Sequence, residues 1–168
     1  MIETVNYKNK KYPAFQTKGH SAQFAIPFAL YVCEGIGYDI GCNRVEWSLP
    51  GSIPIDPIIN KKYSATNLPA SLYGQVDYIF SSHCLEHISG DWYSVLQYWV
   101  NNLKPSGTLF LYLPDFSQEY WRPWNNRKHV HVFTPQILED AFRSLKLQDI
   151  FVSGIDLNNS FMIMGVKI

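Results

Sequence analysis

The chain has 168 residues, and its 14 lysines and arginines balance its 14 aspartates and glutamates, so the formal net charge is zero. This length suits one domain with a substantial core rather than two, and we treat residues 1–168 as a single domain. A neutral balance provides no basic field, so we expect neither nucleic acid nor a membrane surface as a partner.

The three cysteines, Cys33, Cys42 and Cys84, are an odd number and lie in apolar stretches. We therefore expect reduced thiols rather than a disulfide framework. The first residues lack the apolar core of a signal peptide, and no apolar run approaches the ~20 residues needed to span a bilayer. The sequence thus predicts a cytoplasmic protein and does not indicate an oligomeric state.

The first part of the chain begins with a polar segment, residues 1–20, which we expect to be a loosely held arm. Apolar residues at helical spacing predict a helix within 21–33, although Pro27 limits where it can begin. Short strands are then predicted at 35–40 and 53–56, with a weaker one at 63–66.

The second part has stronger signals. Residues 76–81 form an apolar run, interrupted at Asp77, of the kind buried in a parallel sheet. Apolar residues from Trp92 to Leu103 recur at helical spacing and predict an amphipathic helix. The remaining predicted elements are a strand at 108–113, a helix that begins at Thr134 and strands at 147–152 and 160–166.

Strands that alternate with helices predict an α/β fold with a mostly parallel sheet. Ligands of such sheets bind beyond the carboxyl ends of the strands, where the strand order reverses. Four sequence phrases fall at or near these ends. Residues 35–43 read Gly-Ile-Gly-Tyr-Asp-Ile-Gly-Cys-Asn, 53–56 read Ile-Pro-Ile-Asp, 76–87 end in Leu-Glu-His, and 103–107 read Leu-Lys-Pro-Ser-Gly.

Together these phrases resemble the class I S-adenosylmethionine-dependent methyltransferases, in particular small type-11-like domains, over about residues 21–168. The resemblance implies a three-layer sandwich around a seven-stranded, mostly parallel, Rossmann-like sheet whose last strand is antiparallel. It also implies S-adenosylmethionine as the cofactor. The expected cofactor contacts are Tyr38, Asp39, Gly41, Cys42, Asn43, Asp56, Ala65, Leu68 and Ser82.

Two of these contacts have a direct physical reason. A side chain at Gly41 would block the approach of the cofactor to the backbone. A carboxylate at Asp56 can accept hydrogen bonds from both ribose hydroxyls. The family's second glycine is replaced by Asn43, which tolerates a left-handed backbone better than most residues. Because the connection at 44–52 is short, we expect an open pocket and weak cofactor affinity.

The stretch His83, Glu86 and His87 has two interpretations. Small-RNA 3′-terminal 2′-O-methyltransferases hold a divalent metal with Glu-x-x-Glu-His and a later histidine, and imidazole and carboxylate suit such an ion. Leu-Glu-His also occurs in many class I methyltransferases that use no metal, where it fixes a helix start. On this basis we expect no metal.

Residues 116–131 form an insert after the strand at 108–113, at the place where the family binds its acceptor. Its aromatic residues lie beside cations, which suits an anionic or sugar-bearing acceptor, although a lid over the cofactor explains them equally well. These residues are Tyr120, Trp121, Trp124, Arg122, Arg127 and Lys128. Candidates for a general base are His83, Asp115 and His131, together with His129.

The sequence therefore predicts an S-adenosylmethionine-dependent methyltransferase that acts on a small-molecule or carbohydrate-like acceptor. The altered glycine turn leaves open a non-catalytic binding module of the same fold. The His-x-x-Glu-His pattern leaves open a metal-assisted RNA 2′-O-methyltransferase. A nicotinamide dehydrogenase fits poorly, because Gly35 and Gly37 precede the turn after the strand instead of lying in it.

Overall fold

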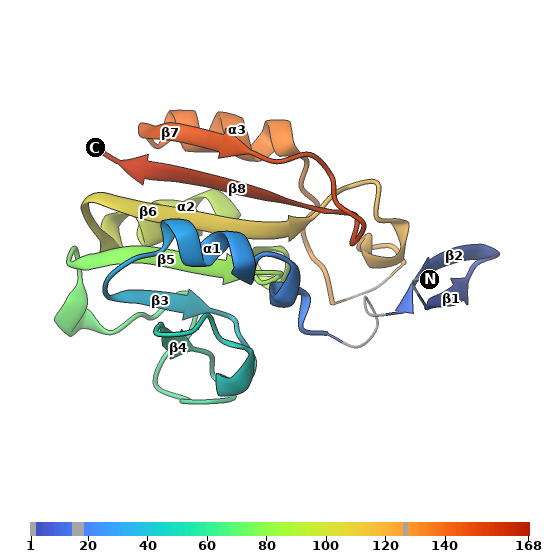
Figure 1. Ribbon diagram of the computed structural model, residues 1–168, viewed down its shortest axis with the longest axis horizontal. Coiled ribbons are helices and arrows are strands. Elements are labelled where there is room, and N and C mark those ends of the chain that lie inside the picture. Colours follow the sequence, from blue (N-terminus) through green and yellow to red (C-terminus); the bar gives the residue numbers. More distant parts are fainter. Residues whose placement is uncertain (1–2, 15–18, 126–127) are drawn as a thin grey trace.

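The computed structural model describes residues 3–14, 19–125 and 128–168. Its main sheet has six strands in the order β4-β3-β5-β6-β8-β7 (Figure 1). Their bounds are β4 Ile53–Ile55, β3 Gly37–Ile40, β5 Val76–Ser82, β6 Leu103–Pro114, β8 Ser160–Lys167 and β7 Leu147–Val152. The first four strands of this order are parallel, and β8 runs antiparallel to both β6 and β7. The α/β class and the antiparallel last strand are confirmed.

The predicted count of seven strands was wrong, because residues 63–66 add no strand to the sheet. Ser64 and Asn67 instead form an isolated antiparallel bridge. The amide of each donates to the carbonyl of the other, at 3.1 and 3.0 Å. This segment folds back on itself in a tight turn, so its backbone groups are satisfied locally and do not pair with β4.

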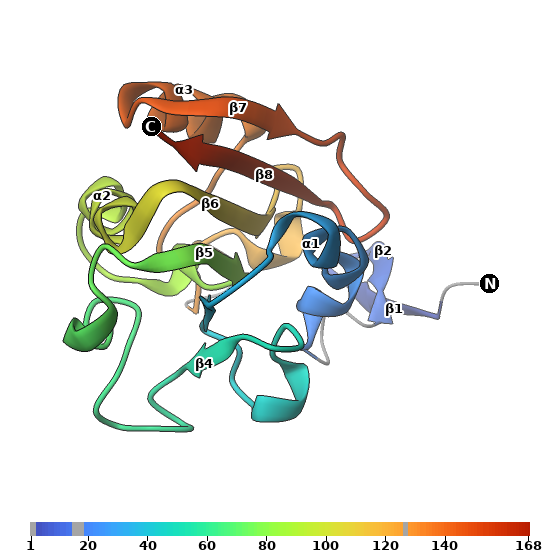
Figure 2. The same cartoon turned by 60° about the vertical axis from the view of Figure 1, so that its left-hand side comes forward.

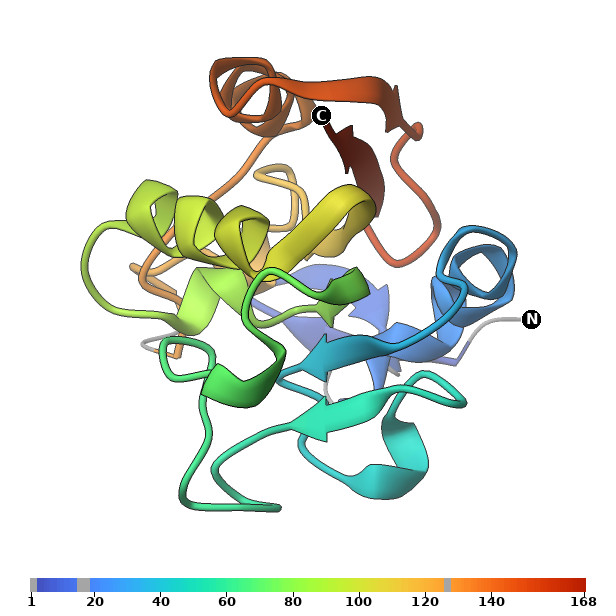
Figure 3. The ribbon, with the colours of Figure 1, turned by 90° about the vertical axis from the view of Figure 1, so that its left-hand side faces the viewer.

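Helices cover both faces of the sheet, which gives three layers (Figure 3). Helix α1 (Ile26–Val32) lies on one face, and helices α2 (Trp92–Asn102) and α3 (Pro135–Ser144) lie on the other. Successive side chains of a strand point to opposite faces. On β6, Phe110 and Tyr112 therefore pack in the core beside α1, while Leu109 and Leu111 pack in the core beside α2 and α3.

Polar caps and a proline set the helix starts. The Asp91 carboxylate accepts from two amides of the first turn of α2, and the Thr134 hydroxyl accepts from the Ile137 amide at the start of α3, as predicted. The segment predicted as a helix within 21–33 is divided: a 3-10 turn at Ser21–Phe24 precedes α1, which has Pro27 in its first turn.

The N-terminal segment forms a hairpin of β1 (Thr4–Tyr7) and β2 (Lys10–Pro13) that is separate from the main sheet (Figure 2). Its partner is the insert: the ring of Tyr120 lies 4.9 Å from that of Tyr7 and 5.9 Å from that of Tyr12. Lys10 also forms an ion pair of 2.6 Å with Glu119. The expectation of a loosely held arm did not anticipate this hairpin.

Within the described ranges, no helix has the length and apolar character required to cross a bilayer.

Candidate functional site

A cavity of about 440 Å³ opens at the carboxyl ends of β3, β4 and β5. Its floor consists of residues that end or follow these strands, where the order of a parallel sheet reverses. The floor residues are Asp39, Gly41, Cys42, Asn43, Asp56, Ile58, Ser82 and His83. Residues 19–22 and Trp47 line one part of the rim, and Trp121, Lys128 and His129 of the insert line another.

The turn after β3 has an unusual backbone that its sequence explains. Gly41 has a φ of 83°, and a Cβ atom there would lie 2.4 Å from the Sγ atom of Cys84. Asn43 has a φ of 65°, so the prediction that it adopts the left-handed conformation is confirmed. Both positions therefore require residues that tolerate positive φ, and Gly41 also allows Cys84 to pack closely.

Asp56 follows β4 and is almost fully buried at the cavity floor. One carboxylate oxygen accepts from the Asn43 amide and the other from the Ile58 amide, each at 2.9 Å. An ionised carboxylate has about four acceptor positions, so these two bonds fix the group and leave capacity for a ligand. The exposed side chain of Ile58 gives the cavity an apolar surface two residues further on.

Asp39 also lines the floor but is more deeply buried than Asp56. Its carboxylate accepts a 2.7 Å hydrogen bond from the Leu49 amide, which holds the short connection between β3 and β4. Burial raises the pKa of Asp39 to about 7, despite the hydrogen bonds from Leu49 and Ser48 that favour the ionised form. Asp39 is therefore only partly ionised near neutral pH.

Two stacked aromatic pairs stand on the rim of the cavity. The rings of His20 and Trp47 lie 5.0 Å apart at 7°, and those of Trp121 and His129 lie 4.8 Å apart at 10°. The stacking holds each ring in one orientation, so the rim offers flat apolar surfaces to a ligand.

A group of histidines around Glu86 forms the side of the cavity next to the insert. The Oε1 atom of Glu86 lies 3.7 Å from His83 Nδ1, 3.8 Å from His87 Nε2 and 3.9 Å from His129 Nε2. Burial lowers the pKa of His83 and of His129 to about 3 and also lowers that of His87, so these rings are neutral near pH 7. Burial also raises the pKa of Glu86 to about 8.

The structure brings most of the predicted cofactor contacts into this one cavity. Those that line it are Asp39, Gly41, Cys42, Asn43, Asp56 and Ser82, and the base candidate His83 lines it as well.

Three predicted cofactor contacts do not line the cavity. Tyr38 is fully buried in the core, with its hydroxyl 3.4 Å from the Pro69 carbonyl. Leu68 is a core residue whose amide donates to Tyr98, and the carbonyl of Ala65 accepts from the indole of Trp99. The contacts to α2 hold this segment in the core beside the helix.

Of the other base candidates, Asp115 and His131 line only a separate small depression beside the cavity. Asp115 accepts from the Ser117 amide at 2.8 Å, and His131 Nε2 lies 2.9 Å from the Ile88 carbonyl. Trp121 and His129 line both hollows and thus lie between them.

Sequence reasoning missed His20 and Trp47 as cavity residues. Trp47 belongs to a 3-10 turn, Val45–Trp47, in the connection that was expected to leave the pocket open. His20 has a φ of 60° and lies at the end of the segment that was expected to be a loose arm. Of the insert residues, Trp121 and Lys128 line the cavity, whereas Arg127 lies outside the described residues.

Comparison with known proteins identifies related folds. A family model described as a methyltransferase domain matches residues 18–150. A search of curated protein sequences found no significant match.

Solved structures agree with the fold. An S-adenosylmethionine-dependent methyltransferase of Thermotoga maritima, described as a possible histamine N-methyltransferase, superposes with a TM-score of 0.72 at 19% identity over 91% of each chain. One from Archaeoglobus fulgidus has a TM-score of 0.65 at 18% identity, over 91% of this chain and 98% of the other. The Burkholderia thailandensis 1,6-didemethyltoxoflavin-N1-methyltransferase, crystallised with its substrate and S-adenosylhomocysteine, has a TM-score of 0.64 at 13% identity, over 88% and 77%. At these identities the likeness establishes the fold.

Proposed function

The chain belongs to the methyltransferase-domain family, and on that premise we propose that it transfers a methyl group from S-adenosylmethionine to a small-molecule or carbohydrate-like acceptor. The proposed cofactor site is the cavity at the ends of β3, β4 and β5. The observation that carries the proposal is Asp56, a carboxylate held by two backbone amides at the cavity floor with acceptor capacity to spare.

The lining of the cavity suits the parts of this cofactor. The Asp56 carboxylate would accept hydrogen bonds from the two ribose hydroxyls, and Ile58 beside it would contact the adenine ring. The methionine part would lie along the turn at Gly41, where no side chain intervenes. The neutral state of His83, which follows Ser82, adds no positive charge of its own beside the sulfonium cation.

When bound, S-adenosylmethionine would supply an electrophilic methyl group for transfer to the acceptor. The protein's contribution is then mainly to position the acceptor and to exclude water. Trp121 and Lys128 from the insert support an acceptor site on that side, with a flat ring for a sugar or heterocycle and a cation for a negative charge. Of the candidate bases, His83 and His129 line the cavity, and we propose His83 as the one that receives the acceptor's proton.

Calorimetry with S-adenosylhomocysteine tests the cofactor site, with Asp56→Asn as the test variant and Asp115→Asn as its matched control. Both aspartates follow a strand and cap the amide two residues on, but only Asp56 lines the cavity. We expect Asp56→Asn to weaken binding by about 10- to 100-fold, the value of hydrogen bonds to a charged group, and Asp115→Asn to leave it unchanged.

Two other outcomes would oppose the proposal. Failure of the wild type to bind S-adenosylhomocysteine would favour a non-catalytic module that uses the fold to bind a partner. Binding without transfer of a radiolabelled methyl group to any acceptor in a broad screen of amines, sugars and heterocycles would favour the same module.

A further inference from the structure

Glu86 is an acidic residue whose side chain is fully buried. Its side chain is 0% exposed, and neither Oε1 nor Oε2 has a hydrogen-bond partner among the described residues. An isolated buried carboxylate is costly, because its lost hydration is not replaced. A bound cation is one of the few groups that would compensate it.

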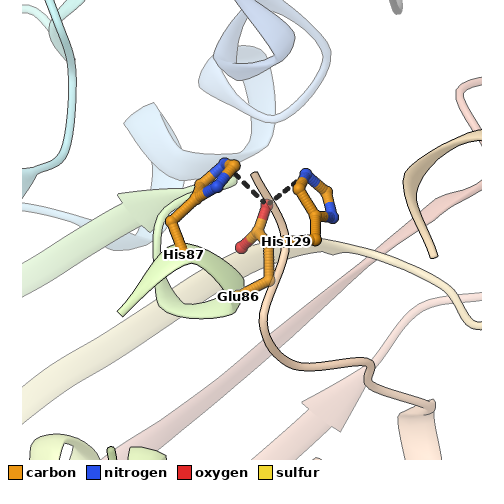
Figure 4. Close-up of side chains that lie close together, drawn as sticks. All are labelled: Glu86, His87 and His129. Atoms are coloured by element: carbon orange, nitrogen blue, oxygen red, sulfur yellow. Dashed lines mark ion pairs between the residues drawn. The ribbon is translucent and has the colours of Figure 1, made fainter. Parts of the chain in front are cut away.

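The neighbours of Glu86 are metal-ligand atoms at a characteristic spacing. Glu86, His87 and His129 each offer one ligand atom, and these three atoms lie within 4.8 Å of one another (Figure 4). The separations of 3.8 and 3.9 Å between Glu86 Oε1 and the two Nε2 atoms exceed a hydrogen bond. In a tetrahedral zinc site with bonds of about 2.0–2.2 Å, ligand atoms are about 3.4 Å apart, so a small inward movement would complete the geometry.

The tautomer of His87 is already the one that a metal ligand needs. Its Nδ1 atom lies 2.6 Å from the carbonyl oxygen of Lys128, which can only accept, so Nδ1 carries the hydrogen. In the neutral ring, Nε2 then presents its lone pair toward Glu86. Histidines that bind metals are commonly held in this way, by a carbonyl on the opposite ring nitrogen.

The ligand segments are also held together by the backbone. The carbonyl of Glu86 accepts from the amides of Val130 and His131, at 2.8 and 3.2 Å. These bonds tie the segment that carries His129 to the one that carries Glu86 and His87. The stacked ring of Trp121 fixes the plane of the His129 imidazole.

We propose that Glu86, His87 and His129 bind a divalent transition-metal ion of the zinc type. Two imidazoles and one carboxylate are a recurrent set of protein ligands for zinc and related ions, and they leave coordination positions open. His87 and His129 line the cavity, so the open positions would face a ligand bound there. This differs from the sequence-based expectation of no metal, which rested on Leu-Glu-His alone and had no information on the burial of Glu86.

The test is zinc binding by the purified protein, without cofactor. Chelator-treated protein is equilibrated with Zn²⁺, separated from free metal by gel filtration and measured by elemental mass spectrometry. We expect one ion per chain in the wild type. Two variants remove a proposed ligand: Glu86→Gln, which keeps the shape of the side chain, and His129→Ala. Loss of a residue that only orients a metal ligand weakens metal affinity by roughly 10- to 100-fold, so each of these variants should weaken zinc affinity by more than that.

His131→Gln is the matched control, because His131 lies in the same segment and donates outside the ligand group, to Ile88. The His131→Gln variant should retain one zinc ion per chain. Zinc should raise the unfolding temperature of this variant and of the wild type, but not that of Glu86→Gln or His129→Ala. Circular dichroism of each variant verifies that it is folded. Replacement of zinc by Co²⁺ should give a spectrum without thiolate charge-transfer bands, which distinguishes the site from zinc held by Cys33, Cys42 or Cys84.

Wild-type protein without stoichiometric zinc would overturn the proposal, as would folded Glu86→Gln and His129→Ala variants that bind zinc as tightly as the wild type. Glu86 would then be a buried neutral acid with a structural role. Because metal content is measured without S-adenosylhomocysteine, this outcome is independent of the cofactor proposal.

Discussion

The carboxylate of Asp56 accepts a 2.9 Å hydrogen bond from the backbone amide of Asn43, which joins the end of β4 to the turn after β3. The donor is the backbone, so the bond depends on the left-handed conformation of Asn43 rather than on its side chain. Replacement of the family's glycine by asparagine therefore preserves the connection between the two strand ends that form the cavity floor.

Substitution of Asn43 tests this conclusion. Asn43→Gly should keep both stability and the affinity for S-adenosylhomocysteine, since glycine adopts positive φ freely. Asn43→Val should lower the free energy of unfolding by about 1–2 kcal/mol, the cost of a left-handed backbone with a branched side chain, and weaken binding by displacing the amide. Urea denaturation and calorimetry measure the two effects. Equal behaviour of the two variants would show that the backbone of this turn is unimportant.

The Gly41→Ala variant should be more destabilised than its control, Gly51→Ala. The two glycines have nearly the same φ, 83° and 84°, but a Cβ at Gly41 would meet Cys84 whereas one at Gly51 meets nothing within 4 Å. Both variants therefore carry the same free-energy cost of placing alanine at a positive φ. Only Gly41→Ala also carries the cost of the steric clash with Cys84. We expect a difference of about 2 kcal/mol in the free energy of unfolding, measured by chemical denaturation. Equal destabilisation of the two variants would mean that glycine is needed at position 41 only because of its positive φ.

The burial of Asp39 predicts a pH-dependent stability. Because the pKa of Asp39 is raised to about 7, the folded chain holds a proton there that the unfolded chain has lost above about pH 4. Stability contributed by this group is therefore lost as the pH rises from about 4 to 7. Asp39→Asn keeps an acceptor for the Leu49 amide and removes the titration.

The difference in unfolding free energy between Asp39→Asn and the wild type should accordingly shift in favour of the variant from pH 4 to pH 8, by at most about 4 kcal/mol. Subtracting the wild type removes the contributions of other groups, including Glu86. A difference that does not change with pH would mean that the Asp39 carboxyl group has its ordinary pKa.

The elements that the sequence predicted best depend on local patterns. The apolar run of β5 and the helical spacing of α2 predicted a buried parallel strand and its covering helix, since both elements are recognisable within a dozen residues. A strand at 63–66 was predicted wrongly, because the sequence of this segment does not reveal that Ser64 and Asn67 pair with each other.

Residues of the candidate site that follow the end of a strand could be predicted from the sequence. Those that reach the site because distant segments of the chain meet could not. Asp56 and Gly41 were identified from their positions after strands. The hairpin packs on the insert through contacts that span much of the sequence, such as that of Tyr7 with Tyr120. His20 joins the cavity by stacking on Trp47. The burial of Glu86 depends on the insert folding over it, which no local pattern records.

The structure of the complex with S-adenosylhomocysteine tests the central claim most directly. We predict that the ligand lies in the cavity, with both ribose hydroxyls within hydrogen-bonding distance of the Asp56 carboxylate, adenine against Ile58 and the sulfur near Ser82. A ligand bound elsewhere, or no bound ligand at saturating concentration, would contradict the assignment of this cavity as the cofactor site.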